Sequence, residues 1–137
     1  MQLEPIENDN WPPQKVPKLG IPVIKGFEFI PHDTLYYLKA SGNYTVLSHI
    51  VQEEGSVRMK DTLSSKGLAY FEDKLSKCPF IRIHDSYIVN LTKITKYTRE
   101  GKDGRVVLDT GKSLVVSRTR KHQLLIAFGL IPAEQAE

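Results

Sequence analysis

Short segments of strand-forming composition, separated by glycine-containing turns, run through most of this 137-residue chain. From Val23 onward, runs of four to eight residues enriched in β-branched and aromatic side chains alternate with turn residues. Gly55 and Gly111 lie in two of these turns, where a positive φ is commonly needed. Strands this short, joined by tight turns, predict a mainly β fold with antiparallel strands. The expected strands cover residues 27–30, 34–40, 44–51, 57–60, 80–84, 86–90, 94–99, 105–109 and 113–117.

The hydrophobic period changes from strand-like to helix-like in two places. Apolar residues recur at three- and four-residue steps within residues 64–77, which predicts a short helix with Ser64 or Ser65 as its N-cap. A second short helix is expected within residues 117–129, with Ser117 as its cap. The expected fold is therefore an arrangement of about eight to ten short strands with two short helices.

The chain is long enough for one domain with flanking segments. Residues 1–22 hold five of the eight prolines and show no apolar period, so we interpret them as a semi-rigid linker. Trp11 is the one residue of this linker able to dock, and we expect it to pack loosely. The domain itself is expected to span residues 23–129, followed by a tail at 130–137.

Positive charge is concentrated in one part of the chain. Residues 93–122 carry nine Lys/Arg against three Asp/Glu, whereas residues 1–92 carry ten against eleven. A basic segment at residues 93–122 in a chain that is otherwise nearly neutral favours a polyanionic partner such as nucleic acid. The alternative is that these cations only keep sheet edges soluble. The longest apolar run, at residues 124–131, is too short to span a bilayer, so no membrane partner is expected.

The single Cys78 cannot form an internal disulfide, and no signal-peptide pattern opens the chain. We therefore expect a cytoplasmic protein.

No motif of a catalytic or metal site is present in the sequence. His84, Asp85 and Ser86 are the residue types of a hydrolase triad, but consecutive strand residues alternate faces and cannot converge. Four scattered histidines and one cysteine lack metal-ligand spacing, and no phosphate-binding glycine motif occurs. The sequence predicts a binding protein without catalytic residues, metal or cofactor.

Polar residues interrupt the strand-forming segment FIRIHDSYIVN at residues 80–90. If Ile83 points into the core, His84 points away from it, and the next two residues lie where the strand breaks. A satisfied structural histidine is the alternative interpretation. Two further clusters have the same chemistry, the turn at residues 41–44 and the SRTRK segment at 117–121. We therefore expect these three clusters to form a binding surface.

Three segments resemble the LytTR-type DNA-binding domain family. FIRIHDSYIVNLTKI (80–94) resembles the family signature, approximately F-x-R-x-H-x-S-[YF]-[VI]-V-N-x-x-x-I. GKSLVVSRTRKHQLL (111–125) resembles its closing segment, and LYYLKASGNYTVL (35–47) resembles its opening strand pair. The order and spacing of the three segments agree, and the resemblance spans about residues 23–128.

The resemblance implies an elongated, mostly β domain that reads double-stranded DNA with loops and has no catalytic activity. By position in the family pattern, the base-reading candidates are Tyr44, Asp85 and Arg118. Arginine suits this role because its planar fork can bind a guanine edge. The residues expected to contact phosphates or support the readers are Asn43, His84, Ser86, Ser117, Arg120 and Lys121.

Asp85 departs from the family, where a basic or amide residue is frequent between the His and the Ser. A carboxylate near phosphates is repelled, so three interpretations remain open for it. It accepts from a cytosine amine, it orients Arg118 or Arg82, or it points away from the DNA.

The resemblance also implies partners beyond DNA. Family members usually join this domain to an upstream receiver domain, so the chain is expected to be a response-regulator output domain of a two-component system, or a freestanding bacterial relative. A homodimer on repeated sites is a further expectation. Two other functions remain open. One is a β-rich protein-interaction module, and the other is a single-stranded RNA binder that stacks bases on Tyr36, Tyr37, Tyr44 or Tyr97.

Overall fold

The computed structural model describes residues 18–132, and the statements below concern this part of the chain. It contains two α-helices, α1 (Leu68–Lys74) and α2 (Lys121–Ala127), and two short 3₁₀ turns, η2 (His32–Thr34) and η3 (Leu91–Lys93). Among residues 18–132, no helix has the length and apolar character needed to cross a membrane. The strands are β1 (Lys18–Val23), β2 (Gly26–Pro31), β3 (Leu35–Ser41), β4 (Tyr44–Glu53), β5 (Ser56–Ser64), β6 (Phe80–His84), β7 (Tyr87–Asn90), β8 (Ile94–Glu100), β9 (Asp103–Leu108) and β10 (Ser113–Val116).

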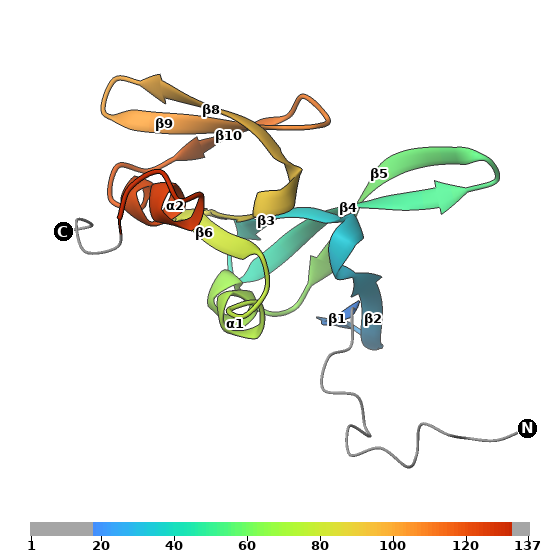
Figure 1. Cartoon of the computed structure of the whole chain (residues 1–137). Coiled ribbons are helices and arrows are strands. Elements are labelled where there is room, and N and C mark those ends of the chain that lie inside the picture. The colour runs from blue at the N-terminus through green and yellow to red at the C-terminus, as the bar shows by residue number, and fades with distance from the viewer. Residues whose placement is uncertain (1–17, 133–137) are drawn as a thin grey trace, which may run out of the picture.

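The strands form three sheets, and every pairing is antiparallel. A central sheet has the order β5-β4-β3-β7-β6, a second sheet has the order β10-β9-β8, and β1 and β2 form a hairpin. In Figure 1 the second sheet lies at the top and α1 and the hairpin lie at the bottom, with the central sheet between them. The mainly β fold with two short helices is therefore confirmed.

The first hydrophobic core lies between the central sheet, α1 and the β1–β2 hairpin. Phe71 of α1 is completely buried there, and Leu38 of β3 lies beneath it in the same cluster. The helix period predicted for residues 64–77 is explained by this contact, since the apolar side chains of α1 face the sheet. The buried members are Leu19, Ile21, Ile30, Leu35, Leu38, Leu47, Leu68, Phe71, Leu75, Phe80 and Ile88.

The second core lies on the opposite face of the central sheet, under the β8–β10 sheet and α2. Neighbouring residues on one strand enter different cores, as Ile88 and Val89 of β7 do. Burial and the nearby Asp109 raise the pKa of Tyr36 to about 12, so this buried phenol stays neutral. The buried members are Tyr36, Ile83, Val89, Val106, Leu108, Leu114, Val116 and Leu124.

Residues 18–22, which the sequence analysis included in the linker, form most of strand β1 instead. Leu19 and Ile21 both lie in the first core, one on each side of the outward-facing Gly20, which is the two-residue period of a strand. The prolines around them made this period hard to recognise in the sequence. Pro22 is tolerated because β1 is an edge strand of a two-stranded hairpin. Its carbonyl accepts a hydrogen bond from Ser65 N–H at 3.1 Å. Trp11 and residues 133–137 lie outside the described residues.

The predicted helix caps are wrong. Ser64 is buried at the end of β5, where its hydroxyl donates to the Pro22 carbonyl at 2.8 Å. Helix α1 begins after Gly67, and α2 begins after Arg120, and neither N-cap residue makes a side-chain capping bond. Ser117 instead accepts Arg120 N–H at its backbone carbonyl, at 3.0 Å, in a turn that precedes α2. Both helices are held by their buried faces.

We predict that Ile21→Ala lowers the free energy of unfolding by about 2–5 kcal/mol, because it leaves a cavity in a completely buried site. Ile24→Ala is the matched control, since Ile24 belongs to the same hairpin and its side chain is 92% exposed. It should change stability by less than about 0.5 kcal/mol. Urea denaturation of the two variants measures both effects. Equal effects of the two substitutions would show that β1 is not part of the core.

Candidate nucleic-acid interface

The three polar clusters of the sequence lie next to one another at one edge of the molecule. Ala40 N–H donates to the Ser86 carbonyl at 2.9 Å, which joins the end of β3 to the turn between β6 and β7. Ser117 N–H donates to the Ile83 carbonyl at 2.8 Å, which joins the end of β10 to the same turn. The β6–β7 turn therefore lies in the middle, between the β3–β4 turn and the loop that leads into α2.

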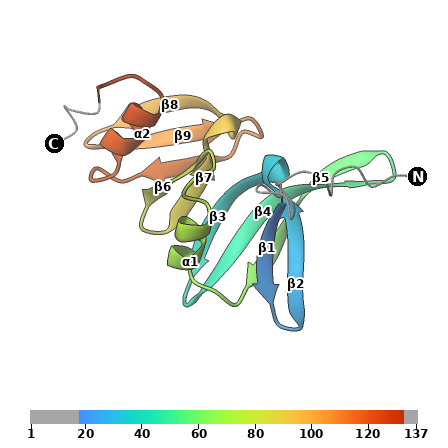
Figure 2. The ribbon, with the colours of Figure 1, turned by 60° about the horizontal axis from the view of Figure 1, so that its bottom comes forward.

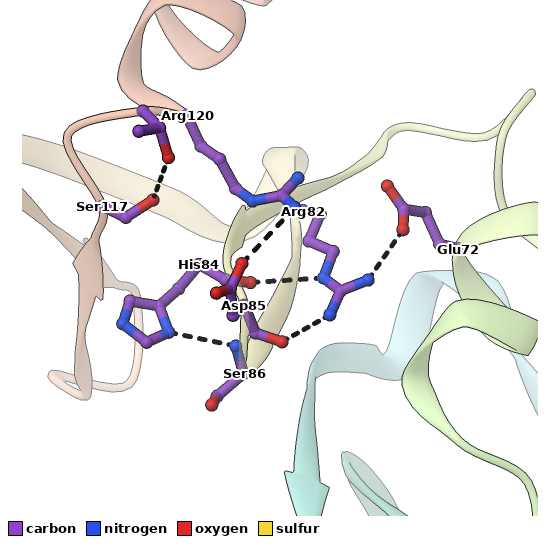
Figure 3. A network of polar contacts seen from close by, with 8 residues as sticks. Glu72, Arg82, His84, Asp85, Ser86, Ser117 and Arg120 are labelled. Atoms are coloured by element: carbon purple, nitrogen blue, oxygen red, sulfur yellow. Dashed lines mark hydrogen bonds and ion pairs between the residues drawn. The ribbon is translucent and has the colours of Figure 1, made fainter.

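His84 stabilises the β6–β7 turn through its ring. Its Nδ1 atom accepts a hydrogen bond from Ser86 N–H at 3.0 Å, as Figure 3 shows. Because Nδ1 is the acceptor, the proton of the neutral ring resides on Nε2, which is left as a donor. The ring also packs against Tyr87, with 5.8 Å between the centroids. His84 is thus both a structural residue of the turn and a donor at its surface.

Arg82 holds the shape of the same turn from behind. Its guanidinium donates to the carbonyls of His84, at 3.3 Å, and of Asp85. Its third contact is an ion pair of 2.9 Å with Glu72, which projects from α1 (Figure 3). The Arg82 side chain is only 17% exposed, so these bonds are partly shielded from water. One planar cation therefore connects the β6–β7 turn to a helix of the first core.

Sequence reasoning assigned no role to Glu72 and named Arg82 only as a possible partner of Asp85. The available signals were an arginine between Ile81 and Ile83, in a strand whose remaining residues before His84 are apolar, and its match to the arginine of the family signature. A buried-strand arginine needs several acceptors. Backbone carbonyls of a turn are acceptors that no side-chain pattern reveals.

Asp85 has a partner that the sequence did not suggest. Its carboxylate lies 3.5 Å from Nη2 of Arg120 (Figure 3), and among residues 18–132 no ion pair joins it to Arg82 or Arg118. Of the three interpretations left open for Asp85, an orienting contact with Arg118 or Arg82 is therefore not the one that the structure contains. The Asp85 side chain is 90% exposed, so the pair contributes little to stability. Its effect is to connect the middle loop to the loop before α2.

The remaining candidate residues are exposed to different degrees. Arg118 and Asn43 are exposed, and within residues 18–132 no side chain pairs with the Arg118 guanidinium. Tyr44 is half exposed and borders an apolar surface cavity that Leu63 also lines. Ser117 and Lys121 are partly exposed at the start of the α2 loop. The structure brings all nine candidates to one edge, and their individual roles remain predictions.

The basic segment at residues 93–122 divides into engaged and free cations. Lys93 and Lys112 lie over the rings of Tyr36 and Tyr37, at 5.0 and 5.8 Å, and Arg105 pairs with Glu100. These three cations, and Arg120 beside Asp85, have partners within the domain. In the described part of the chain, the cations of this segment without such a partner are Lys96, Arg99, Lys102, Arg118 and Lys121.

The tip of the β8–β9 hairpin extends the basic edge. Val116 of β10 pairs with Gly104, so the hairpin tip adjoins the loop that begins at Ser117. Arg99 and Lys102 belong to this tip. Free cations from two separate segments therefore gather near the α2 loop, which is the arrangement that a phosphate backbone requires.

Comparison with known proteins identifies the family. The LytTr DNA-binding domain family matches residues 25–129. The CO-responsive transcriptional regulator RcoM of Rhodospirillum rubrum is 28% identical over 104 residues, which is 73% of this chain and 39% of that protein. This chain thus spans about two fifths of the length of that regulator.

A solved structure shares the fold. The LytTr DNA-binding domain of a putative methyl-accepting/DNA response regulator from Bacillus cereus superposes with a TM-score of 0.67 at 23% identity. The superposition covers 84% of this chain and 99% of that one. The family match over most of the chain carries the assignment, and the polar edge described above lies within it. The chain belongs to the LytTR family of DNA-binding domains.

Proposed function

We propose that this DNA-binding domain recognises specific sites on duplex DNA as the output module of a transcription regulator. The observation that carries the proposal is the row of three polar loops, with an exposed, unpaired Arg118 beside a turn held rigid by Arg82. A rigid turn and a free guanidinium are what direct readout requires, since base contacts depend on accurate placement of the donor.

The loops divide into base-reading and phosphate-binding groups. Arg118 presents its fork to a guanine edge, while Lys121 and Arg120 approach phosphates on either side. The His84 Nε2–H group and the Ser86 hydroxyl supply neutral donors in the middle loop. Asn43 and Tyr44 read the next turn of the groove. Asp85 keeps Arg120 in place and lies within reach of a cytosine amine.

The alternative of a single-stranded RNA binder is disfavoured by the positions of the tyrosines. Tyr36 is buried beneath Lys93, and Lys112 lies over Tyr37. A stacking platform needs several exposed rings side by side. Of the four candidate rings, Tyr44 is the one that is mostly free, at 51% exposure.

The domain acts with a module that receives a signal. The Rhodospirillum rubrum relative is named a CO-responsive transcriptional regulator, and the solved domain comes from a putative response regulator. For this chain, a receiver domain of a two-component system is the module that the resemblance favours, with homodimers forming on repeated sites. Because chromosomal DNA is the target, we place the protein in the bacterial cytoplasm.

We predict that binding to a selected duplex weakens strongly with salt. About five free cations in the basic segment can each neutralise one phosphate, so log affinity should fall with log salt at a slope of about −4 to −5. Fluorescence anisotropy across a salt series measures the slope. Binding that does not respond to salt, or preference for single-stranded RNA, contradicts the proposal.

Arg118 and Lys121 should differ in kind, although both are cations of the same loop. Arg118→Ala should cost about 1–3 kcal/mol on the selected site and remove the preference at one base pair. Lys121→Ala should weaken selected and random duplexes alike and make the salt slope about one unit shallower. Selection of sites from random duplex DNA with each variant separates the two effects.

Arg118→Lys is the decisive control, because it keeps the charge and removes the planar fork. The variant should retain the salt slope and lose the base preference. If Arg118→Lys binds the selected site as tightly and selectively as the parent chain, Arg118 contacts only a phosphate and its assignment as a base reader is wrong.

We predict that Arg82→Lys weakens binding to the selected site about five- to tenfold, corresponding to about 1–1.4 kcal/mol, because an ammonium cannot hold both turn carbonyls and Glu72 together. The salt slope should stay unchanged, since the charge is kept. Arg58→Lys is the matched control, because Arg58 forms an exposed pair with Glu53 on the β4–β5 hairpin. If the parent chain, Arg82→Lys and Arg58→Lys bind the selected site equally tightly, Arg82 does not position the turn.

A further inference from the structure

The outward face of the β1–β2 hairpin is apolar and lacks a covering element among residues 18–132. Leu19, Ile21 and Ile30 point inward to the first core, whereas Phe27 and Phe29 point outward. Their side chains are 62% and 65% exposed, and the two rings stack with 6.5 Å between centroids. Two neighbouring exposed phenylalanines are unusual on a free surface, so this face indicates a contact site.

This face forms one wall of a shallow groove, and α1 forms the other. Residues of β1, β2 and α1 line it together, and Figure 2 shows α1 and the hairpin in the lower half of the molecule. The Phe29 ring lies over Gly20, with its nearest atom 3.4 Å from where a Cβ atom would be, so this ring packs directly on the backbone of β1. The residues that shape the groove are Lys18, Phe27, Phe29, His32, Tyr70 and Lys74.

The groove combines aromatic rings with cations and has no carboxylate in its lining. The ammonium groups of Lys66 and Lys74 lie 5.6 and 5.3 Å from the centre of the Tyr70 ring. The surface suits a ligand that offers an aromatic side chain together with negative charge. The end of the groove at Lys18 and His32 adjoins the start of β3, whereas the β3–β4 turn of the polar edge follows the end of β3.

A segment with this chemistry enters the domain at the groove itself. Residues 1–17 join β1 at Lys18, which is one of the residues lining the groove. They contain Trp11, and their charged residues are three acids, Glu4, Glu7 and Asp9, and one Lys15. Six residues lie between Trp11 and Lys18, so the seven Cα–Cα steps of an extended chain span up to about 25 Å, enough to return along the hairpin.

We propose that Trp11 binds the groove between the β1–β2 hairpin and α1 within the same chain, with the preceding acidic residues beside Lys18 and Lys74. The indole covers Phe27 and Phe29, which are otherwise exposed. The contact fixes where the segment before the domain leaves it, on the hairpin side of the first core. Any upstream module is then held at a defined place relative to the DNA-reading edge.

Trp11 is the only tryptophan of the chain, so its fluorescence reports this contact directly. In the full chain, its emission should be shifted to the blue and its quenching by acrylamide should be several-fold weaker than for N-acetyltryptophanamide. Phe27→Ala and Phe29→Ala should each shift the emission to the red and increase quenching. Lys74→Glu should do the same, more strongly at low salt.

Phe128→Ala is the matched control, because Phe128 is an exposed aromatic residue, 43% exposed, at the end of α2. It should leave Trp11 emission unchanged. Circular dichroism verifies that each variant is folded, and NMR of the unmodified chain should show cross-relaxation between the indole and the Phe27 or Phe29 ring. This measurement needs no substitution.

Emission and quenching equal to the free indole, without indole–phenylalanine cross-relaxation, overturn the proposal. A blue shift that disappears on dilution also overturns it, because the occupant is then a second copy of the chain. None of these outcomes depends on DNA binding, so the test stands apart from that of the proposed function.

Discussion

Burial of both faces of the central sheet is the constraint on which the rest of the structure depends. β3, β6 and β7 are covered by α1 and the β1–β2 hairpin on one side and by the β8–β10 sheet and α2 on the other. Strands in such a position need apolar residues at nearly every position. The pairs Leu35–Tyr36 and Ile88–Val89 meet this need, since the two members of each pair enter different cores. Arg82, in the middle of β6, is a polar exception, and carbonyls of the following turn and Glu72 accept from it.

This constraint explains the location of the binding edge. The same strands that lie deepest in the domain end at the turns that carry His84, Asp85 and Ser86. A turn attached to a doubly buried strand has little freedom to move, and Arg82 restricts it further through its two carbonyl bonds. The candidate interface consists of loops, and the most central of these loops is joined to strands that pack in both cores.

Much of the fold could be predicted from the sequence because the turns are marked by glycine and the strands by composition. Every strand from β2 to β10 overlaps an expected segment, and both helices lie within their expected ranges. β1 was missed because it is short and bounded by prolines, so that Leu19 and Ile21 gave too weak an alternation. The caps were missed because Ser64 has a better partner in the Pro22 carbonyl, 42 residues away.

The candidate site was predicted as a set of residues, while its internal contacts were not. Local patterns and the family resemblance placed Asn43, His84 and Arg118 at one edge. They contained no information on pairs formed across the fold, such as Glu72 with Arg82 or Asp85 with Arg120. Such pairs depend on the separation of α1, α2 and the β6–β7 turn in space, which is set by the two cores and not by neighbouring residues in the chain.

The contact between Asp85 and Arg120 has a consequence for altering the DNA preference of this domain. The two residues belong to different loops, so a substitution in one loop changes the rotamers open to a side chain in the other. The loops cannot then be exchanged between relatives one at a time, as independent modules. A designer who transplants the β6–β7 turn would have to transplant the residues before α2 with it. Libraries that vary both loops together would contain combinations that libraries of a single loop never contain.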